Sequence, residues 1–183
     1  MKNIVKVIAV LAITLIIGGC GAAKLSPSEQ ALVNAKVYTQ VAMWDYKSTV
    51  IGTNYSITSL IPINSEVSIS KVTSKAIIFT YKDKEIVFKN IPKYTGVDIN
   101  GLLTRSFANK KVDLSTFDEK TQKNIIAGSV VTGMSKKAVI LARGYAPVHE
   151  TASFESNTWK YWKTRWNTIL VEFKDNKVSK IID

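Results

Sequence analysis

The sequence predicts an α+β protein in which a small β-barrel precedes a module of two helices and a three-stranded antiparallel sheet. Apolar and polar residues alternate through much of residues 36–90, which is the period of half-buried strands. Helix-capping signals cluster between residues 98 and 143, and three strand-like runs follow them. With 183 residues, of which 46% are hydrophobic, the chain is long enough to bury two small cores.

Residues 1–19 have the layout of a signal peptide. Lys2 and Lys6 precede an apolar run from Val7 to Ile17, and small residues then lead to Cys20. The stretch from Val7 to Ala23 is interrupted by Gly18, Gly19 and Gly21, and its 17 residues are fewer than the roughly 20 that a membrane-spanning helix needs. An uncleaved anchor helix is therefore the less favoured alternative.

The segment Ile17-Gly18-Gly19-Cys20 resembles the lipobox of bacterial lipoproteins. This resemblance implies cleavage before Cys20, diacylation of its sulfur and, usually, acylation of the new N-terminus. Two or three acyl chains hold a protein on a bilayer, whereas one chain does not. We therefore expect a cell-envelope protein anchored in the membrane through Cys20, with residues 20–28 as a lipidated tether. In a Gram-negative cell, Gly21 implies the outer membrane, facing the periplasm.

The chain is strongly basic, with a formal net charge of +11. Removal of residues 1–19 takes away two lysines and leaves 23 basic against 14 acidic residues, a net charge of +9. Such a charge attracts anionic phosphates within a Debye length of about 8–10 Å. The export signal argues against nucleic acid as the partner, so anionic lipid and cell-wall polymer are the polyanions that remain.

Residues 29–95 are predicted to form the barrel domain. Ser26-Pro27-Ser28-Glu29 has the spacing of a capping box and begins a short helix through about Lys36. Strands follow, and Lys82-Asp83 joins the runs 75–81 and 84–90 as a tight hairpin. Together with these hairpins, the segments Gly52-Thr53-Asn54-Tyr55 and Leu60-Ile61-Pro62-Ile63 are similar to bacterial SH3-like barrels.

Residues 96–112 are predicted as a connector helix, and residues 113–183 as the second domain. Asp98 is the expected cap of a helix over Ile99 to Ala108, with its apolar face formed by Ile99, Leu102, Leu103 and Phe107. A second helix is expected from Thr116 to a stop at Gly128, with Ser115 ahead of it, and Ser135 is expected to cap a third over Lys136 to Arg143. The final strands are expected over residues 159–163, 168–173 and 178–182, with Asp175-Asn176 as the last turn.

A dispersed pattern of residues marks the C-terminal part: Ile126-Ala127-Gly128, Gly133-Met134-Ser135, Val139, Gly144-Tyr145, Ala146-Pro147, Trp159, Tyr161, Val171, Phe173 and Lys177-Val178. Through this pattern, residues 125–183 resemble the small lipoproteins of the SmpA/OmlA family, which includes a small lipoprotein component of the outer-membrane β-barrel assembly machine. The resemblance implies two helices against a three-stranded antiparallel sheet. The chain departs from the family in carrying an extra domain in front, and the family's partner-contact positions are not matched.

Few residues have the context that catalysis requires. The single Cys and single His argue against thiolate-rich and His-based metal sites, and no cofactor is expected. His149 lies beside Glu150 with no nucleophile motif near it, so we interpret it as a polar loop residue. Gly128, Gly133 and Gly144 precede no Lys-Ser/Thr pair and are assigned to helix ends and turns. We therefore do not expect an enzyme.

Four aromatic residues, Trp159, Tyr161, Trp162 and Trp166, lie within eight positions near the C-terminus. On a strand, Trp159 and Tyr161 face the same side and are assigned to the core, which leaves Trp162 partly exposed. An exposed indole flanked by cations suits a protein partner, a glycan ring or a lipid interface. The candidate partner-binding residues are Trp162, Trp166, Lys160, Lys163 and Arg165.

These observations predict a non-enzymatic, lipid-anchored scaffold or accessory subunit of an envelope complex, with an envelope protein as its partner. One alternative is a module that binds peptidoglycan or an anionic surface polymer through the barrel. Another is an inhibitor of an envelope enzyme, because the predicted C-terminal fold resembles that of β-lactamase inhibitor proteins. Binding to purified cell wall separates the first alternative from the scaffold, and crosslinking in membranes identifies the partner.

Overall fold

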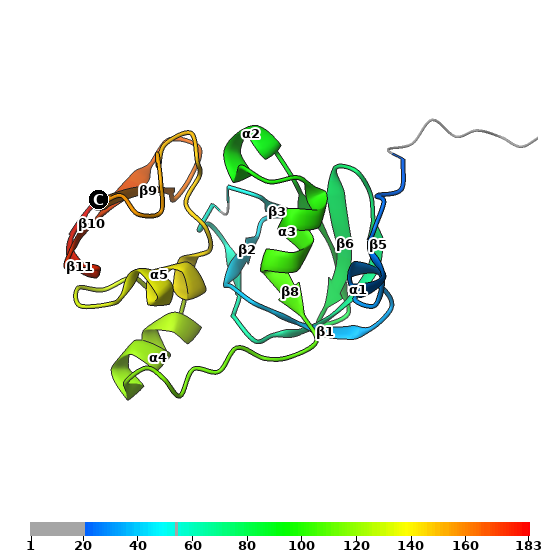
Figure 1. Ribbon diagram of the computed structural model, residues 1–183, viewed down its shortest axis with the longest axis horizontal. Helices are drawn as coiled ribbons and strands as arrows, with labels where there is room; N and C mark the ends of the chain where they lie inside the picture. Colours follow the sequence, from blue (N-terminus) through cyan, green and yellow to red (C-terminus); the bar gives the residue numbers. More distant parts are fainter. Residues whose placement is uncertain (1–20, 54) are drawn as a thin grey trace, which may run out of the picture.

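The computed structural model describes residues 21–53 and 55–183, and it shows a mixed α+β protein (Figure 1). Within these residues the strands form a six-stranded, a three-stranded and a two-stranded sheet. The predicted α+β class is therefore confirmed. Cys20 and the signal segment before it lie outside the described residues.

The six-stranded sheet belongs to the N-terminal half. Its strands pair in the order β3-β7-β6-β5-β1-β8, with β3 parallel to β7 and the other neighbours antiparallel. The bounds of these strands are Lys36–Thr39 for β1, Thr49–Ile51 for β3, Glu66–Val72 for β5, Ala76–Tyr81 for β6, Lys84–Lys89 for β7 and Phe107–Ala108 for β8. Strands β2 (Met43–Asp45) and β4 (Ser59–Ile61) pair antiparallel to form the small sheet.

The hairpin between β6 and β7 forms where the sequence predicts it. Lys82 and Asp83 both have positive φ angles, 48° and 61°, as in the type I′ turns that match the twist of antiparallel strands. The pairing then places alternate residues on the buried face: Ile77, Phe79, Ile86 and Phe88. A period of two in the sequence thus becomes one apolar face of the sheet.

The predicted barrel closure is not observed. Strands β3 and β8 form the two ends of the six-stranded sheet, and no strand pairing among the described residues joins them. Strands β2 and β4 pair only with each other among the described strands. The structure supports an open sheet with a small second sheet beside it, and the SH3-like description remains a proposal.

The segment predicted as a connector contributes to the first core. It contains α3 (Ile99–Ser106), and the short helix α2 (Pro92–Thr95) precedes it. Asp98 caps α3 as predicted, since its Oδ1 accepts a hydrogen bond from the Gly101 N–H at 2.8 Å. The predicted apolar residues Ile99, Leu102, Leu103 and Phe107 are all buried in the first core. The helix ends at Ser106 and not at the predicted Ala108, because Phe107 and Ala108 are extended and form β8, which pairs with β1. Helix α3 is therefore part of the first half (Figure 1).

The C-terminal half contains the predicted two helices and three strands. Helices α4 (Glu119–Ile126) and α5 (Lys136–Arg143) pack beside the sheet β11-β10-β9, which is antiparallel throughout. The strand bounds are Thr158–Trp162 for β9, Thr168–Lys174 for β10 and Lys177–Ile182 for β11. The turn at Asp175-Asn176 forms as predicted, with positive φ at both residues.

The helix starts in this half agree with the sequence in one case and differ in the other. Ser135 caps α5 and Gly144 follows its last residue, as predicted. Helix α4 begins at Glu119 and not at Thr116, because Asp118 is the cap and accepts the Thr121 N–H at 2.9 Å. The prediction that placed the start beside Ser115 is wrong by three residues.

The N-terminal helix is shorter than predicted. Helix α1 (Pro27–Gln30) has the predicted capping box, in which Ser26 and Glu29 each accept a hydrogen bond from the other's backbone N–H. It ends at Gln30 and does not reach Lys36, because β1 begins there to pair with β5. No helix of the described part of the chain is long and apolar enough to cross a membrane.

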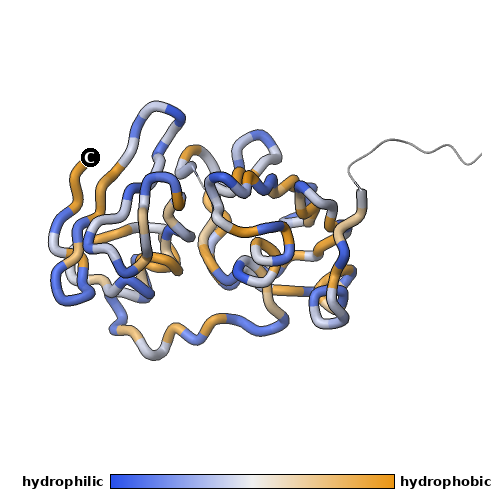
Figure 2. The backbone as a smooth tube through the Cα atoms, turned by 45° about the horizontal axis from the view of Figure 1, so that its top comes forward, coloured by the Kyte–Doolittle hydropathy of each residue, from blue (hydrophilic) through white to orange (hydrophobic). Residues whose placement is uncertain are grey.

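Each half has its own apolar core, and the two cores are in contact. The first consists of the faces of the large sheet and α3, and the second of α4, α5 and the three-stranded sheet. Ile63 from the first half is part of the second core. Backbone hydrogen bonds also join the halves, from Ala42 N–H to Leu141 O at 3.0 Å and from Val148 N–H to Tyr94 O at 2.9 Å. Figure 2 shows the chain between β8 and α4 crossing along the outside.

Candidate functional site

The β9–β10 hairpin places the aromatic residues near the C-terminus on opposite faces of the sheet. Trp159 and Tyr161 are 0% and 1% exposed, so their predicted assignment to the core is confirmed. Trp159 packs against Phe154 and Phe173, with ring centroids 5.4 and 4.6 Å apart. Lys160 and Trp162 alternate with these two residues and are half-buried. The cluster is therefore divided between core and surface by the period of the strand.

The turn between β9 and β10, residues 163–167, displays Trp166 to solvent. The Lys163 and Thr164 N–H groups both donate to Asn167 O, at 2.7 and 3.1 Å. Thr164 Oγ1 accepts the N–H groups of Trp166 and Asn167, both at 3.1 Å. Trp166 is nevertheless 81% exposed. We call residues 163–167 the tryptophan turn, since its own hydrogen bonds hold the indole away from the protein.

The three cations of the predicted binding residues, Lys160, Lys163 and Arg165, differ in their ion pairs and ring contacts. The Arg165 guanidinium lies 5.2 Å from the centre of the Trp166 ring. Lys160 donates to Glu150 Oε2 at 2.9 Å, and Lys163 donates to Asp183 Oδ2 at 2.7 Å. Arg165 forms no ion pair among the described residues. It is therefore the cluster cation whose charge is most available to a partner.

A cavity of about 200 Å³ lies where the two halves meet, and we call it the junction pocket. It is lined by residues of both halves: Thr53, Tyr55, Tyr94, His149, Trp162 and Arg165. The Tyr55 and Trp162 rings are 6.3 Å apart, and the Tyr94 and His149 rings are 4.5 Å apart. Two buried polar atoms of the lining, Thr53 Oγ1 and Trp162 Nε1, have no hydrogen-bond partner among the described residues. Rings with polar edges suit a planar or sugar-like group.

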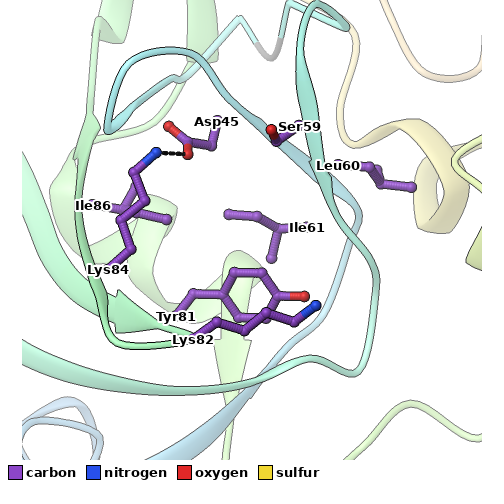
Figure 3. A pocket seen from close by; sticks show the side chains of 8 residues that line it. All are labelled: Asp45, Ser59, Leu60, Ile61, Tyr81, Lys82, Lys84 and Ile86. Carbon is purple, nitrogen blue, oxygen red and sulfur yellow. Dashed lines mark hydrogen bonds and ion pairs between the residues drawn. The ribbon is translucent and has the colours of Figure 1, made fainter.

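A second cavity, the Asp45 pocket, has a volume of about 300 Å³ and lies between the small sheet and the β6–β7 hairpin (Figure 3). Ile61, Ile86 and Leu60 supply its apolar lining, while its polar groups come from Asp45, Ser59, Tyr81, Lys82 and Lys84. Two amines against one carboxylate give this pocket a net positive charge.

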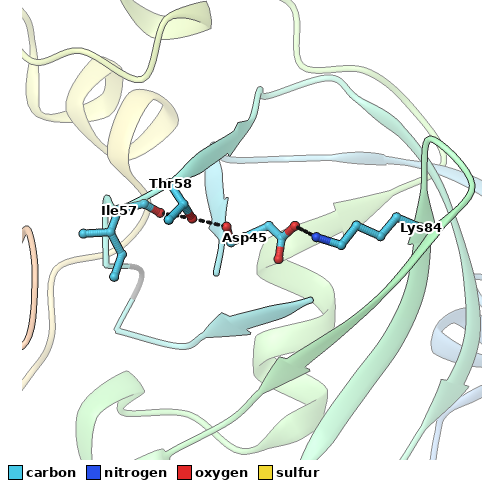
Figure 4. Close-up of polar contacts among 4 residues, drawn as sticks. All are labelled: Asp45, Ile57, Thr58 and Lys84. Carbon is cyan, nitrogen blue, oxygen red and sulfur yellow. Dashed lines mark hydrogen bonds and ion pairs between the residues drawn. The ribbon is translucent and has the colours of Figure 1, made fainter. Parts of the chain in front are cut away.

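Asp45 supplies the carboxylate of that pocket, and its side chain is only 6% exposed. Its Oδ2 accepts a hydrogen bond from the Lys84 amine, while its Oδ1 has no partner among the described residues. The Thr58 hydroxyl donates to the Asp45 backbone carbonyl (Figure 4). A buried oxygen without a donor costs about 1–3 kcal/mol, so a ligand N–H or O–H that reached it would be stabilised.

Sequence reasoning missed both pockets. Asp45 and Lys84 are 39 residues apart in the chain, and the sequence assigns Lys82 only to a hairpin turn. Tyr55 and Trp162, which meet in the junction pocket, lie in different halves of the chain. Strand periodicity contains no signal for either pairing, because it describes one strand at a time.

Among the described residues no group of three or more His, Cys, Asp and Glu side chains is placed to hold a metal ion. No family model matches the chain, and neither a curated protein nor a solved structure matches it. The resemblances to SmpA/OmlA lipoproteins and to SH3-like barrels therefore remain predictions.

Proposed function

We propose that the protein is a non-enzymatic, lipid-anchored accessory subunit of a cell-envelope complex, and that it contacts a partner protein through the tryptophan turn. Acyl chains on Cys20 provide the anchor. In a Gram-negative cell, the location is the outer membrane, on its periplasmic side. We relate the first half, with its open sheet, to the SH3-like fold, and the second half to the SmpA/OmlA fold.

The observation that supports this proposal is the 81% exposure of Trp166 on a turn held by its own hydrogen bonds. Tryptophan and arginine are enriched among the few residues that supply most of an interface's binding energy. A turn that is already ordered loses little conformational entropy on binding, so the indole and Arg165 are presented ready for contact. The second half also contains the two helices and three strands that the family resemblance implies.

The test is site-specific photo-crosslinking in intact membranes. A photoreactive residue replaces Asn167, which is exposed on the tryptophan turn, in one variant and Lys47, in the other half, in a control variant. We expect a discrete crosslinked partner at position 167 that is absent at position 47. Adding Trp166→Ala to the first variant should remove the crosslink, whereas adding Tyr46→Ala, which truncates another exposed aromatic side chain, should leave it intact. Equal crosslinking at both positions would contradict the proposal.

The anchor requires its own measurement. Intact-mass analysis of the protein from membranes should show acyl chains on Cys20 and loss of residues 1–19. An unmodified cysteine would exclude the lipoprotein assignment.

A second function, binding of peptidoglycan or an anionic surface polymer, is supported by the Asp45 pocket. Its net positive charge suits a carboxylate or phosphate, and its buried Asp45 Oδ1 offers an acceptor for a neighbouring N–H or O–H. Lys82→Glu is the informative change, because Lys84→Ala would leave the Asp45 carboxylate buried without its ion pair. Co-sedimentation with purified cell wall should fall with Lys82→Glu and persist with Lys174→Glu. Equal binding by both variants would exclude this pocket.

A further inference from the structure

The first described residues are fixed against one end of the large sheet. Ala22 forms a β-bridge with Thr73, and the Gly21 carbonyl accepts the Ser74 N–H at 3.0 Å. Ala23 and Leu25 pack on the first core. The predicted tether therefore lies along the protein from Gly21 onward, and the turn between β5 and β6 lies close to the residue that follows Cys20.

Five exposed lysines surround this end of the sheet, and we call them the basic end: Lys24, Lys71, Lys75, Lys89 and Lys93. Lys71 and Lys75 flank the residues that hold Ala22. Lys89 pairs with Ala76 at the neighbouring strand ends, and the Asn90 N–H donates to Lys75 O at 2.8 Å, which brings the start of α2 with Lys93 to the same place. None of the five forms an ion pair with the described residues.

Acidic side chains offset only part of the charge of the basic end, which keeps an excess of positive charge. Two acids lie near it, Glu29 and Asp98, and both carboxylates accept backbone N–H groups at helix starts. Glu29 also accepts the Asn100 amide at 3.2 Å and is buried. At the far ends of these strands the charges are mixed, since Asp83 and Glu85 alternate with lysines and Glu66 pairs with Lys36 at 2.9 Å. Lysines without an acidic partner are thus concentrated at the end of the sheet that lies beside Gly21 and Ala22.

We propose that the basic end rests on the anionic lipid headgroups of the membrane in which Cys20 is anchored. This inference depends on the proposed acylation of Cys20. An extended residue spans at most about 3.6 Å, so Ala22 lies within about 7 Å of the acylated residue. That distance is shorter than the Debye length of about 8 Å at physiological salt, so headgroup charge reaches the end of the sheet that holds Ala22, where Lys71 and Lys75 flank its bridge partner.

The orientation has a consequence for the tryptophan turn. The described chain begins beside β5 and β6, whereas β9, β10 and β11 lie on the other side of the molecule (Figure 1). Lipid contact at the basic end therefore points the C-terminal sheet away from the bilayer. Trp166 then faces the aqueous side of the envelope, where a protein partner is accessible.

Lysine footprinting of the full, lipidated chain tests the proposal. The protein is reconstituted into vesicles of phosphatidylcholine alone, or of equal parts phosphatidylcholine and phosphatidylglycerol, and acetylated with an amine-reactive ester. Mass spectrometry then gives the rate at each lysine. We expect the five lysines of the basic end to react several-fold more slowly in the anionic vesicles. The reference lysines Lys174, Lys177 and Lys180, which are exposed on the C-terminal sheet, should react equally in both.

Matched charge reversals provide the second arm of the test. Lys71→Glu with Lys75→Glu should restore the rates at Lys24, Lys89 and Lys93, whereas Lys174→Glu with Lys177→Glu should not. Uniform protection of all lysines, or equal rates in the two vesicle types, would overturn the orientation. The intact mass of the same sample separates the lipid anchor from the lipid contact. An unmodified Cys20 would overturn the anchor, whereas a lipidated chain without selective protection would overturn only the contact of the basic end with headgroups.

Discussion

Gly128 lies so close to Trp44 that a Cβ placed on the glycine would be 2.8 Å from the Trp44 Cζ2 atom. The contact joins the turn after α4 in the second half to β2 in the first half. Gly128 also has a φ of +66°, a conformation that costs other residues about 1–2 kcal/mol. The residue that the sequence assigns to a helix end is thus also part of the contact between the two halves.

Gly128→Ala should destabilise the protein through both backbone strain and collision with the indole. Gly133→Ala is the matched control, because Gly133 has a φ of +88° but no atom lies within 4 Å of the position that a Cβ would take there. Thermal unfolding should show a larger loss of melting temperature for Gly128→Ala. Equal losses of melting temperature would mean that the Trp44 ring moves aside for the added methyl group without loss of stability.

Trp159→Ala and Trp166→Ala should change the stability of the protein by very different amounts, although both residues belong to one aromatic cluster. Trp159 is fully buried, so its truncation should cost about 3–5 kcal/mol of unfolding free energy. Trp166 is 81% exposed, and its truncation should change that free energy by no more than about 0.5 kcal/mol. Denaturant unfolding of the two variants measures both values. A large loss with Trp166→Ala would show that the tryptophan turn stabilises the fold.

The first half should fold alone only when it includes α3 and β8. Leu102, Leu103 and Phe107 are all buried in the first core, and β8 is the edge strand beside β1. A fragment of residues 21–109 should therefore unfold cooperatively, whereas residues 24–95 should not. Circular dichroism during heating separates the two cases. A cooperative transition in residues 24–95 would show that the first half folds without α3. For the second half, a fragment of residues 113–183 is predicted to retain structure of its own.

Acid should weaken the start of α4. A hydrogen bond from the Thr121 side chain, followed by one from its backbone N–H, lowers the pKa of Asp118 below its ordinary value of 3.8. As the pH falls through this range, the unfolded chain takes up the proton first, so the contribution of Asp118 is present above pH 3.8 and is lost as the pH passes the folded-state pKa. The melting-temperature difference between the wild type and Asp118→Asn should therefore shrink on acidification. A difference independent of pH would contradict this assignment.

Burial also affects an arginine and a tyrosine at the contact between the halves. Desolvation lowers the pKa of Arg143 to about 10, and it raises the pKa of the neighbouring Tyr161 phenol. The Arg143 guanidinium lies 4.9 Å from the centre of the Trp44 ring. An arginine that the sequence places in the last turn of α5 thus spans the two halves, and at neutral pH it does so as a cation.

Local features could be predicted from the sequence because neighbouring residues determine them. The caps at Ser26, Asp98 and Ser135 bond to N–H groups three residues away, and the turns at Lys82-Asp83 and Asp175-Asn176 follow from the residue types in each pair. The burial of Trp159 and Tyr161 followed from the period of a strand. The α+β class was therefore accessible before any tertiary contact was known.

Only the tertiary structure decided which distant elements meet. The pairing of Asp45 with Lys84, the approach of Tyr55 to Trp162, the inclusion of α3 in the first core and the open edge of the large sheet all join segments far apart in the chain. Hydrophobic burial drives such contacts, and it is nearly non-directional, so a pattern of apolar residues identifies the buried face of an element but not its neighbour. Shape complementarity and strand pairing select the neighbour, and they depend on the whole fold.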